Sequence, residues 1–200
     1  MTASSMLFCR RPRGLSWLAA AALVVGPLLV GLFAAAPARA QGIDVQRAAL
    51  IPAEEGYFLE ADFEIALTHT LEDALNKGVP LYFALEFELI RPRWYWFNEK
   101  LANVRQQYRL SYNALARQYR VGVGKLYQNF GSLPEALEFL SRVRQRDITE
   151  PGAVAKGSTY MAAVRMRLDT SQLPRPFHIT AAGSRDWSLS SDWHRWTISP

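Results

Sequence analysis

Two stretches of the chain alternate between apolar and polar residues, and this pattern restricts the fold more than any other feature of the sequence. In residues 56–67 every odd position is apolar, and three of the even positions are acidic. In residues 79–90 every odd position is again apolar, and Glu86 and Glu88 occupy even positions. Because side chains alternate between the two faces of a strand, a period of two predicts strands with one buried and one solvated face.

Weaker alternation indicates further strands at 104–112, 115–123 and 158–169, and near the C-terminus. Asn113-Ala114 suits a tight connection, so the first two of these predict an antiparallel hairpin in which Leu115 shares a face with later apolar residues.

Two short helices are predicted between the strands. Residues 71–77 precede Gly78, which suits the left-handed backbone at a helix end. Ser132 and Glu135 have the spacing of a capping box, which predicts a helix that continues to about Arg144. Short strands at regular spacing with two short helices predict a mainly β fold, either an antiparallel β-sandwich or an open barrel.

The basic charge of the protein is concentrated in its first forty residues. The whole chain has a formal net charge of +5, and residues 1–40 contain Arg10, Arg11, Arg13 and Arg39 but no acidic residue. Of the 23 basic residues, 19 remain in 41–200 against 18 acidic ones, which leaves a net charge of +1 there. This near-neutral remainder argues against nucleic acid as a partner.

Residues 1–40 have the organisation of a secretion signal. The arginines precede an uncharged apolar stretch from Leu15 to Ala36, and Ala38-Arg39-Ala40 has the small-x-small spacing of a signal-peptidase site. The apolar stretch exceeds the ~7–15 residues of an ordinary signal and is long enough to span a bilayer core of ~30 Å. We predict a cleaved signal peptide, residues 1–40, and a periplasmic protein. The alternative is an uncleaved inner-membrane anchor with the rest of the chain facing the periplasm, and only then does the protein contact the membrane.

Residues 41–200 are predicted to form a single β-rich domain without thiols. Cys9, the only cysteine, lies in the predicted signal, so disulfides and cysteine chemistry are excluded for the remainder. About 160 residues are enough for one domain with a sizeable core.

Five segments of the chain resemble a known family. They are RWYWFNEK, YRLSYNALARQYRV, SLPEAL, RMRLDTSQLPRPF and DWSLSSDW. On these segments the chain from about residue 49 to its end is similar to domain-of-unknown-function family 4390, exported bacterial proteins that have also been labelled proline-rich signal peptide proteins. The resemblance implies export and a similar size. Genes of the family often lie beside one for a nitrogen-regulation-type sensor kinase, but the resemblance implies no activity, cofactor or catalytic residue.

Two aromatic clusters are candidates for a binding surface. Alternation along 91–97 puts large aromatic side chains on both faces, so one face enters the core and the other needs a cover or a partner. Arginines between the rings suit cation–π contacts. If the two clusters meet, they form either one binding face or a structural minicore. The candidate residues are Arg91, Arg93, Trp94, Tyr95, Trp96, Trp187, Trp193 and Trp196.

The histidines and carboxylates form no recognisable catalytic or metal-binding motif. His194 lies near Ser190 and Asp192 in the sequence, but there is no Gly-x-Ser-x-Gly elbow. No two histidines have a ligand spacing, so we predict no metal site and no cofactor. Glu86 and Glu88 lie about 7 Å apart on one strand face, a separation at which paired carboxylates hydrolyse glycosides. Solubility of an exposed face is the simpler interpretation.

Two further basic segments have structural interpretations. Residues 122–125 imitate a phosphate loop without its spacing, which predicts a strand end that bends or bulges. Arg142, Arg144 and Arg146 fall at the end of the second predicted helix, where cations complement the helix dipole. Docking of an acidic partner or of lipid headgroups is the alternative for these arginines.

We predict no catalytic residue and favour a non-catalytic module of the cell envelope that binds a protein partner. The gene neighbourhood of the family makes the outer domain of a sensor kinase a candidate partner. The alternative is a protein that binds a small amphiphile or lipid in an aromatic-lined cavity. A hydrolase that uses His194 or the pair Glu86 and Glu88 is the third hypothesis.

Overall fold

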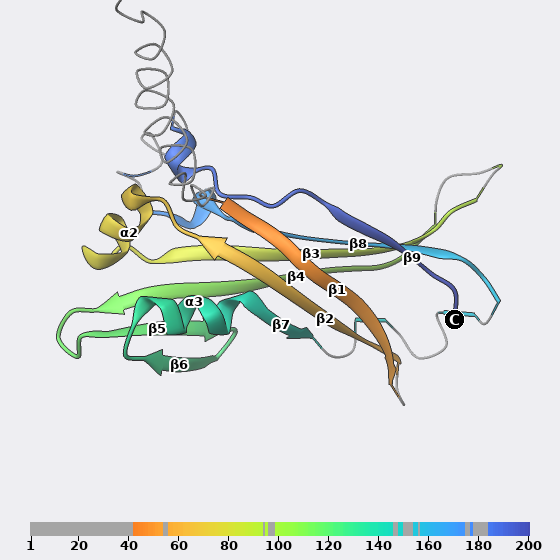
Figure 1. Ribbon diagram of the computed structural model, residues 1–200, viewed down its shortest axis with the longest axis horizontal. Coiled ribbons are helices and arrows are strands. Elements are labelled where there is room, and N and C mark those ends of the chain that lie inside the picture. The colour runs from red at the N-terminus through yellow and green to blue at the C-terminus, as the bar shows by residue number, and fades with distance from the viewer. Residues whose placement is uncertain are drawn as a thin grey trace, which may run out of the picture. The chain divides into compact units, whose positions relative to one another are not determined.

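The computed structural model describes residues 42–53, 56–93, 95, 99–145, 148–149, 154–155, 157–174, 177 and 184–200. Within these residues the chain forms two antiparallel sheets (Figure 1) and is sandwich-like, not a closed barrel, which confirms the predicted mainly β fold class. The strands are β1 (Gly42–Ala53), β2 (Gly56–Ala66), β3 (Leu81–Arg91), β4 (Glu99–Asn113), β5 (Gln118–Val123), β6 (Leu126–Phe130), β7 (Arg142–Gln145), β8 (Tyr160–Leu168) and β9 (His194–Ile198). The helices are α2 (His69–Asn76) and α3 (Leu133–Ser141), with 3₁₀ turns η2 (Thr170–Gln172) and η3 (Arg185–Trp187).

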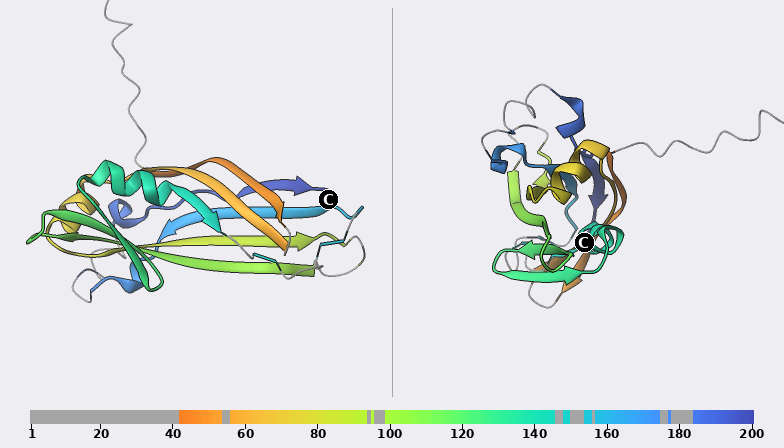
Figure 2. Two further views of the ribbon diagram at one scale, coloured as in Figure 1. Left: turned by 90° about the horizontal axis from the view of Figure 1, so that it is seen from below. Right: turned by 90° about the vertical axis from the view of Figure 1, so that its left-hand side faces the viewer.

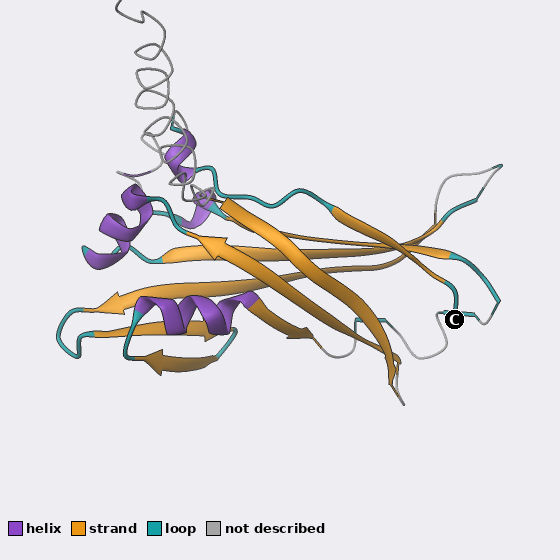
Figure 3. Cartoon of the chain, viewed as in Figure 1, coloured by secondary structure: helices purple, strands orange, loops and turns teal. Residues whose placement is uncertain are grey.

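The larger sheet has the strand order β6-β5-β4-β3-β8-β9, and the smaller one has the order β1-β2-β7. Strand β3 is paired on both sides, so that Phe87 lies opposite Val104 of β4 and Val164 of β8. Strand β3 is therefore a central strand of the larger sheet (Figure 3). Its odd positions from 81 to 89 are buried, and its even positions, which include Glu86 and Glu88, lie on the opposite face.

The core lies between the two sheets. Strands β1 and β2 cross one face of the larger sheet (Figure 2). From β3 the predicted apolar positions are fully buried: Leu81, Phe83, Leu85, Phe87 and Leu89. They join one cluster with buried residues of the smaller sheet, which include Leu59, Ala61, Phe63 and Val143. Burial of a side chain of this size stabilises the fold by about 1.5–3 kcal/mol.

The second helix, α3, starts at the predicted cap, whereas α2 starts at His69, two residues before the predicted start at Leu71. The Thr68 side chain accepts a hydrogen bond from the Leu71 N–H at the start of α2, and Gly78 follows that helix with φ +89°. The Ser132 side chain accepts from the Glu135 N–H, 3.4 Å away, at the start of α3. Each cap satisfies a backbone donor that the helix itself leaves unpaired.

The predicted end of the second helix is wrong. Helix α3 stops at Ser141, and residues Arg142–Gln145 form β7, which pairs with β2. Burial of Val143 in the core favours an extended backbone over another helical turn. Arg142 is the C-cap residue of α3 and pairs with Glu138, whereas Arg144 lies within β7 and pairs with Glu60 and Asp62. Arg146 lies outside the described residues.

Three local expectations about strands also differ from the structure. Leu115 is fully exposed, because residues 114–117 form a turn between β4 and β5 in which Asn113 Oδ1 accepts from the Leu115 N–H. The predicted strand end at 122–125 is present, since β5 ends at Val123, but the chain there makes a tight hairpin turn through Gly124 and Lys125, with β6 as the returning strand. Strand β1 was not predicted, since its apolar residues do not alternate regularly.

Among the described residues, no helix combines the length and the apolar character needed to cross a membrane. The predicted signal peptide, residues 1–40, lies outside the described residues.

Candidate functional site: the charged face of the larger sheet

The face of the larger sheet that points away from the core, which we call the charged face, is formed by the even positions of β3 and their cross-strand neighbours. The outward side chains of β4 are exposed along its length: Asn103, Arg105, Gln107 and Arg109. The inward side chains Tyr108 and Leu110 are buried. Arginine is the commonest charged residue on the charged face, and several of these arginines contact one acidic residue, Glu86.

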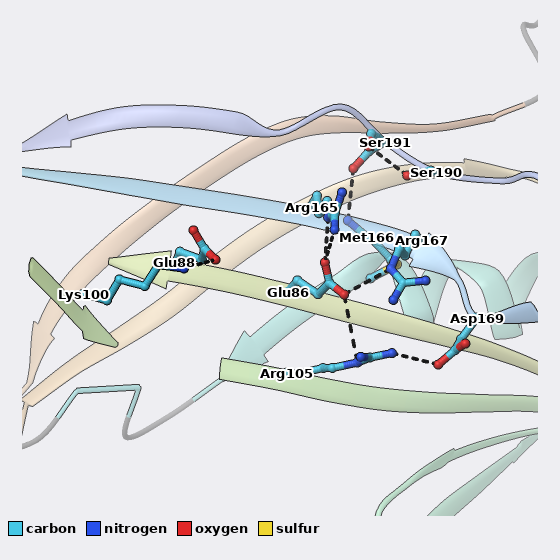
Figure 4. Close-up of polar contacts among 10 residues, drawn as sticks. All are labelled: Glu86, Glu88, Lys100, Arg105, Arg165, Met166, Arg167, Asp169, Ser190 and Ser191. Carbon is cyan, nitrogen blue, oxygen red and sulfur yellow. Dashed lines mark hydrogen bonds and ion pairs between the residues drawn. The ribbon is translucent and has the colours of Figure 1, made fainter. Parts of the chain in front are cut away.

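Glu86 joins three strands of the charged face in what we call the Glu86 hub, which consists of Glu86, Arg105, Arg165 and Arg167 (Figure 4). Arg165 Nε donates a hydrogen bond to Glu86 Oε2 at 2.6 Å, and Arg167 Nε donates to Oε1 at 3.1 Å. Arg105 Nε lies 4.0 Å from Oε1. Arg105 also donates through Nη2 to Asp169 Oδ2 at 2.9 Å, which extends the network past the end of β8.

The surroundings of Glu86 and of the neighbouring Asp169 hold both carboxylates in the ionised form. Burial alone would raise the pKa of Glu86, but hydrogen bonds from Arg165 and Arg167 and the charges of these two residues outweigh it, so the pKa lies below its usual value. Burial likewise opposes ionisation of Asp169, but hydrogen bonds from Ser171 and the charge of Arg105 keep the pKa of Asp169 low. Arg165 also lies 4.4 Å from the centre of the Trp193 ring. We conclude that the hub is a structural clamp across β4, β3 and β8.

Beside the hub, the charged face contains a cavity of about 390 Å³, which we call the basic hollow. It lies where the β5–β6 turn meets β4. Gly122 forms part of its floor, since it faces outward between Arg109 and Tyr127 and carries no side chain. Its lining includes Tyr82, Arg109, Arg120, Gly122, Lys125 and Tyr127.

Tyrosine rings support the two arginines of the basic hollow. The Arg120 guanidinium lies 4.5 Å from the centre of the Tyr127 ring, and its Nε donates to Asn129 Oδ1 at 2.9 Å. The Arg109 guanidinium lies 5.8 Å from the centre of the Tyr82 ring. Stacking on an aromatic face restricts a guanidinium without neutralising its charge.

No acidic residue of the described chain lines the basic hollow or forms an ion pair with Arg109, Arg120 or Lys125. The acids nearby are engaged elsewhere, as Glu86 is in its hub and Glu88 is with Lys100 at 3.1 Å. Three cations therefore share one concave surface without an internal counter-charge. Such a surface attracts anionic groups, and clefts lined by one sign of charge strengthen this attraction.

The first predicted aromatic cluster is only partly described. Arg91 donates to Ser158 Oγ at 2.9 Å and lies 5.8 Å from the centre of the Tyr160 ring, and Arg93 pairs with Glu99. Tyr95 is 70 % exposed. Trp94 and Trp96 lie outside the described residues, so their role as a binding surface stays a prediction.

The three tryptophans near the C-terminus have three different surroundings. Trp187 is 3 % exposed and packs on Phe177, with ring centres 5.7 Å apart. Trp196 packs toward the core, 6.4 Å from Phe87. Trp193 lies against Arg165 of the hub. No ring contact between two of these tryptophans occurs among the described residues.

The model of one protein family matches residues 40–197, nearly all of the predicted domain. This family is described as "Domain of unknown function (DUF4390)". The chain belongs to this family. No curated protein and no solved structure was found to match it. Membership in DUF4390 confirms the resemblance noted in the sequence and assigns no residue a role.

The residues considered for catalysis are engaged in packing and pairing. His194 lies against the Trp196 ring at 5.7 Å, and Ser191 Oγ, which is buried, accepts from the Met166 N–H at 3.0 Å. Ser190 Oγ donates to the Ser191 carbonyl. Glu86 is ionised in its hub, as described above. In the part of the chain that the structure describes, no three His, Asp or Glu side chains are placed to hold a metal ion.

The basic hollow was not found from the sequence, because its residues come from four strands and a turn and share no motif. A signal was nevertheless present at Gly124-Lys125. A two-residue loop that begins with glycine and separates two short alternating segments is typical of a β-hairpin turn. Recognition of this hairpin aligns Gly122 with Tyr127 and Arg120 with Asn129 on one face.

Proposed function

We propose that the protein is a non-catalytic binding module of the cell envelope that binds an acidic segment of a partner protein through the basic hollow. Export and the envelope location rest on the sequence of residues 1–40. The gene neighbourhood of the family makes the outer domain of a sensor kinase the first partner to examine.

The observation that carries this proposal is the group of three cations without an acidic partner in the described chain. Arg109 lies opposite Gly122, so Arg120, two residues before Gly122, is its diagonal neighbour across the strand pair. Diagonal neighbours lie about 7–8 Å apart, and their Cβ atoms are somewhat closer, which lets both guanidinium groups reach neighbouring carboxylates. Lys125 adds a third charge from the turn.

An acidic protein segment fits this surface better than a reacting substrate does. The guanidinium fork binds carboxylates in a planar, bidentate manner, which favours recognition. Proton transfer near neutral pH needs a group with a pKa close to 7, and the pKa of Glu86 lies below its usual carboxyl value.

The proposal is tested by crosslinking in intact envelopes, followed by recovery of the protein and its partners. We expect Arg109→Glu and Arg120→Glu to reduce recovery of a specific partner at least tenfold. Arg195→Glu is the matched control, since Arg195 is an exposed arginine of β9 whose cross-strand neighbour is Ala163, away from the hollow. Unchanged recovery with both hollow variants, each folded as judged by circular dichroism, refutes the proposal.

A second candidate function rests on an apolar cavity at another place. A cavity of about 490 Å³ is lined by β1, β2 and the C-terminal residues, and includes Leu50, Tyr57 and Ile198. Its lining suits an acyl chain or another small amphiphile. Native mass spectrometry after gentle extraction tests this function: a bound lipid-sized mass that is lost in Leu50→Glu supports it, and ligand-free protein throughout rejects it.

A further inference from the structure

The edge of the larger sheet beside the basic hollow is formed by β6, and this edge differs from the others. No described strand pairs with the second side of β6. Natural sheets protect exposed edges with charged residues, proline or bulges, because unpaired N–H and C=O groups otherwise recruit another strand. Among the four described edge strands, β1 has Pro52 and a bulge after Val45, β7 has two arginines, and β9 has Arg195. Strand β6 has none of these protections.

The pairing of β5 with β6 determines which backbone groups face outward from the sheet. Gly124, with φ +59°, and Lys125 connect the strands as a two-residue turn closed by Val123 and Leu126. The closing pair of such a hairpin is hydrogen-bonded, and hydrogen-bonded pairs alternate with pairs whose N–H and C=O groups point away. Tyr127 and Asn129 are in the second kind of pair. Their backbone groups therefore face the open side of β6.

The two faces of β6 differ in chemistry. On the charged face, Tyr127 and Asn129 contact Arg120, and Lys125 lies at the adjacent turn. On the opposite face, Leu126 is 79 % exposed. Phe130 on that face packs on Phe139 of α3, which is itself 40 % exposed. A strand added to this edge thus meets cations on one face and apolar groups on the other.

We propose that a partner protein adds an extended strand to β6, and that this strand alternates acidic and apolar residues. This inference rests on the proposed function and states how the acidic segment binds. Backbone hydrogen bonds to Tyr127 and Asn129 supply affinity, and the acidic side chains reach Arg120 and Lys125. The alternate side chains cover Leu126 and Phe139.

A second copy of this chain fits the edge less well than such a partner does. Strand β6 has no acidic residue, so pairing two β6 edges brings Arg120 and Lys125 of both copies together without counter-charges. Like charges across paired strands are destabilising.

The probe is a blocked synthetic peptide of alternating glutamate and valine, titrated into the purified protein by calorimetry and NMR. We expect binding that slows hydrogen exchange of the Tyr127 and Asn129 amides. A peptide with lysine in place of glutamate should not bind. A peptide of the same composition, with its glutamates grouped at one end, should bind at least tenfold more weakly.

The decisive variants remove single groups of the edge. Asn129→Pro removes an outward N–H without loss of a β5–β6 hydrogen bond, and we expect at least a tenfold loss of affinity. Asn129→Ala keeps the N–H but removes the contact with Arg120, so a loss below about threefold is expected. The inference is overturned if Asn129→Pro binds as tightly as the unaltered protein, or if the grouped peptide binds equally well.

The same variants separate this inference from the proposed function. If Arg120→Glu abolishes partner recovery from envelopes and Asn129→Pro leaves it intact, binding of an acidic partner is supported and strand addition to β6 is rejected. If neither variant changes recovery, both proposals fail. A dimer in sedimentation velocity that Asn129→Pro dissociates shows self-association instead, and rejects the acidic strand.

Discussion

Replacement of Glu86 by glutamine tests whether the Glu86 hub clamps the larger sheet. Glutamine has nearly the same shape and retains one acceptor oxygen, but it carries no charge. Glu88→Gln is the matched control, because Glu88 lies two residues away on the same face of β3 and has one described ion-pair partner, Lys100. We expect Glu86→Gln to be clearly the more destabilising of the two.

The magnitude follows from the number of contacts and their exposure. The Glu86 side chain is 15 % exposed and faces three arginines, whose exposure is 31 %, 31 % and 53 %. A hydrogen bond to a charged group contributes about 1.5–3 kcal/mol, and the low end applies here because the arginines stay partly hydrated once the charge is lost. We expect a loss of about 2 kcal/mol for Glu86→Gln. An exposed pair such as Glu88 with Lys100 contributes only about 0.5 kcal/mol.

Urea unfolding followed by tryptophan fluorescence measures the difference. With a slope of about 2 kcal/mol per molar urea, the midpoint should fall by about 1 M in Glu86→Gln and by about 0.25 M in Glu88→Gln. Equal midpoints for the two variants, with unchanged slopes, would show that the Glu86 contacts contribute no more than a surface ion pair.

Three further perturbations have expected outcomes. Because Glu86 and Asp169 have folded-state pKa values below their usual ones, the stability they provide is complete above about pH 4.5 and is lost as the pH falls through their folded values. Urea midpoints should decline in this window, less steeply in Glu86→Gln, and a midpoint that rises on acidification contradicts the assignment. Trp187→Ala removes a side chain that is 3 % exposed and should cost about 3–5 kcal/mol in thermal or urea unfolding; a loss below about 1 kcal/mol rules out a core position. Gly56→Ala places a Cβ 2.9 Å from a backbone oxygen at φ +139°, so it should cost more than Gly78→Ala, which has open space at φ +89°; equal losses show that the close contact relaxes.

The alternating strands could be predicted because their local and tertiary requirements agree. Every apolar position predicted for β3 is buried, and Glu86 and Glu88 lie on the opposite face, as expected. The caps at Thr68 and Ser132 are local hydrogen bonds between neighbouring residues, so the sequence contains their whole cause.

The errors occur where a tertiary contact decides the local structure. Helix α3 gives way to β7 because pairing with β2 buries Val143, and the pattern of residues 133–144 contains no trace of β2. The basic hollow shows the same limit. Arg109 and Arg120 belong to neighbouring strands that were predicted, but only the register places Arg109 opposite Gly122 and therefore diagonal to Arg120 on the same face.

The position of β3 has a consequence for the synthesis of the chain. Residues Leu81–Arg91 can pair with β4 early, whereas the flank that accepts β8 waits for Tyr160–Leu168, which are made much later. Nascent or prematurely terminated chains therefore present an unpaired strand with a strongly apolar face, the kind of surface on which chaperones and proteases act. We therefore expect quality control in the cell to remove shortened products that lack β8. These products cannot complete the central pairing of the larger sheet, because β8 lies in the last fifth of the polypeptide.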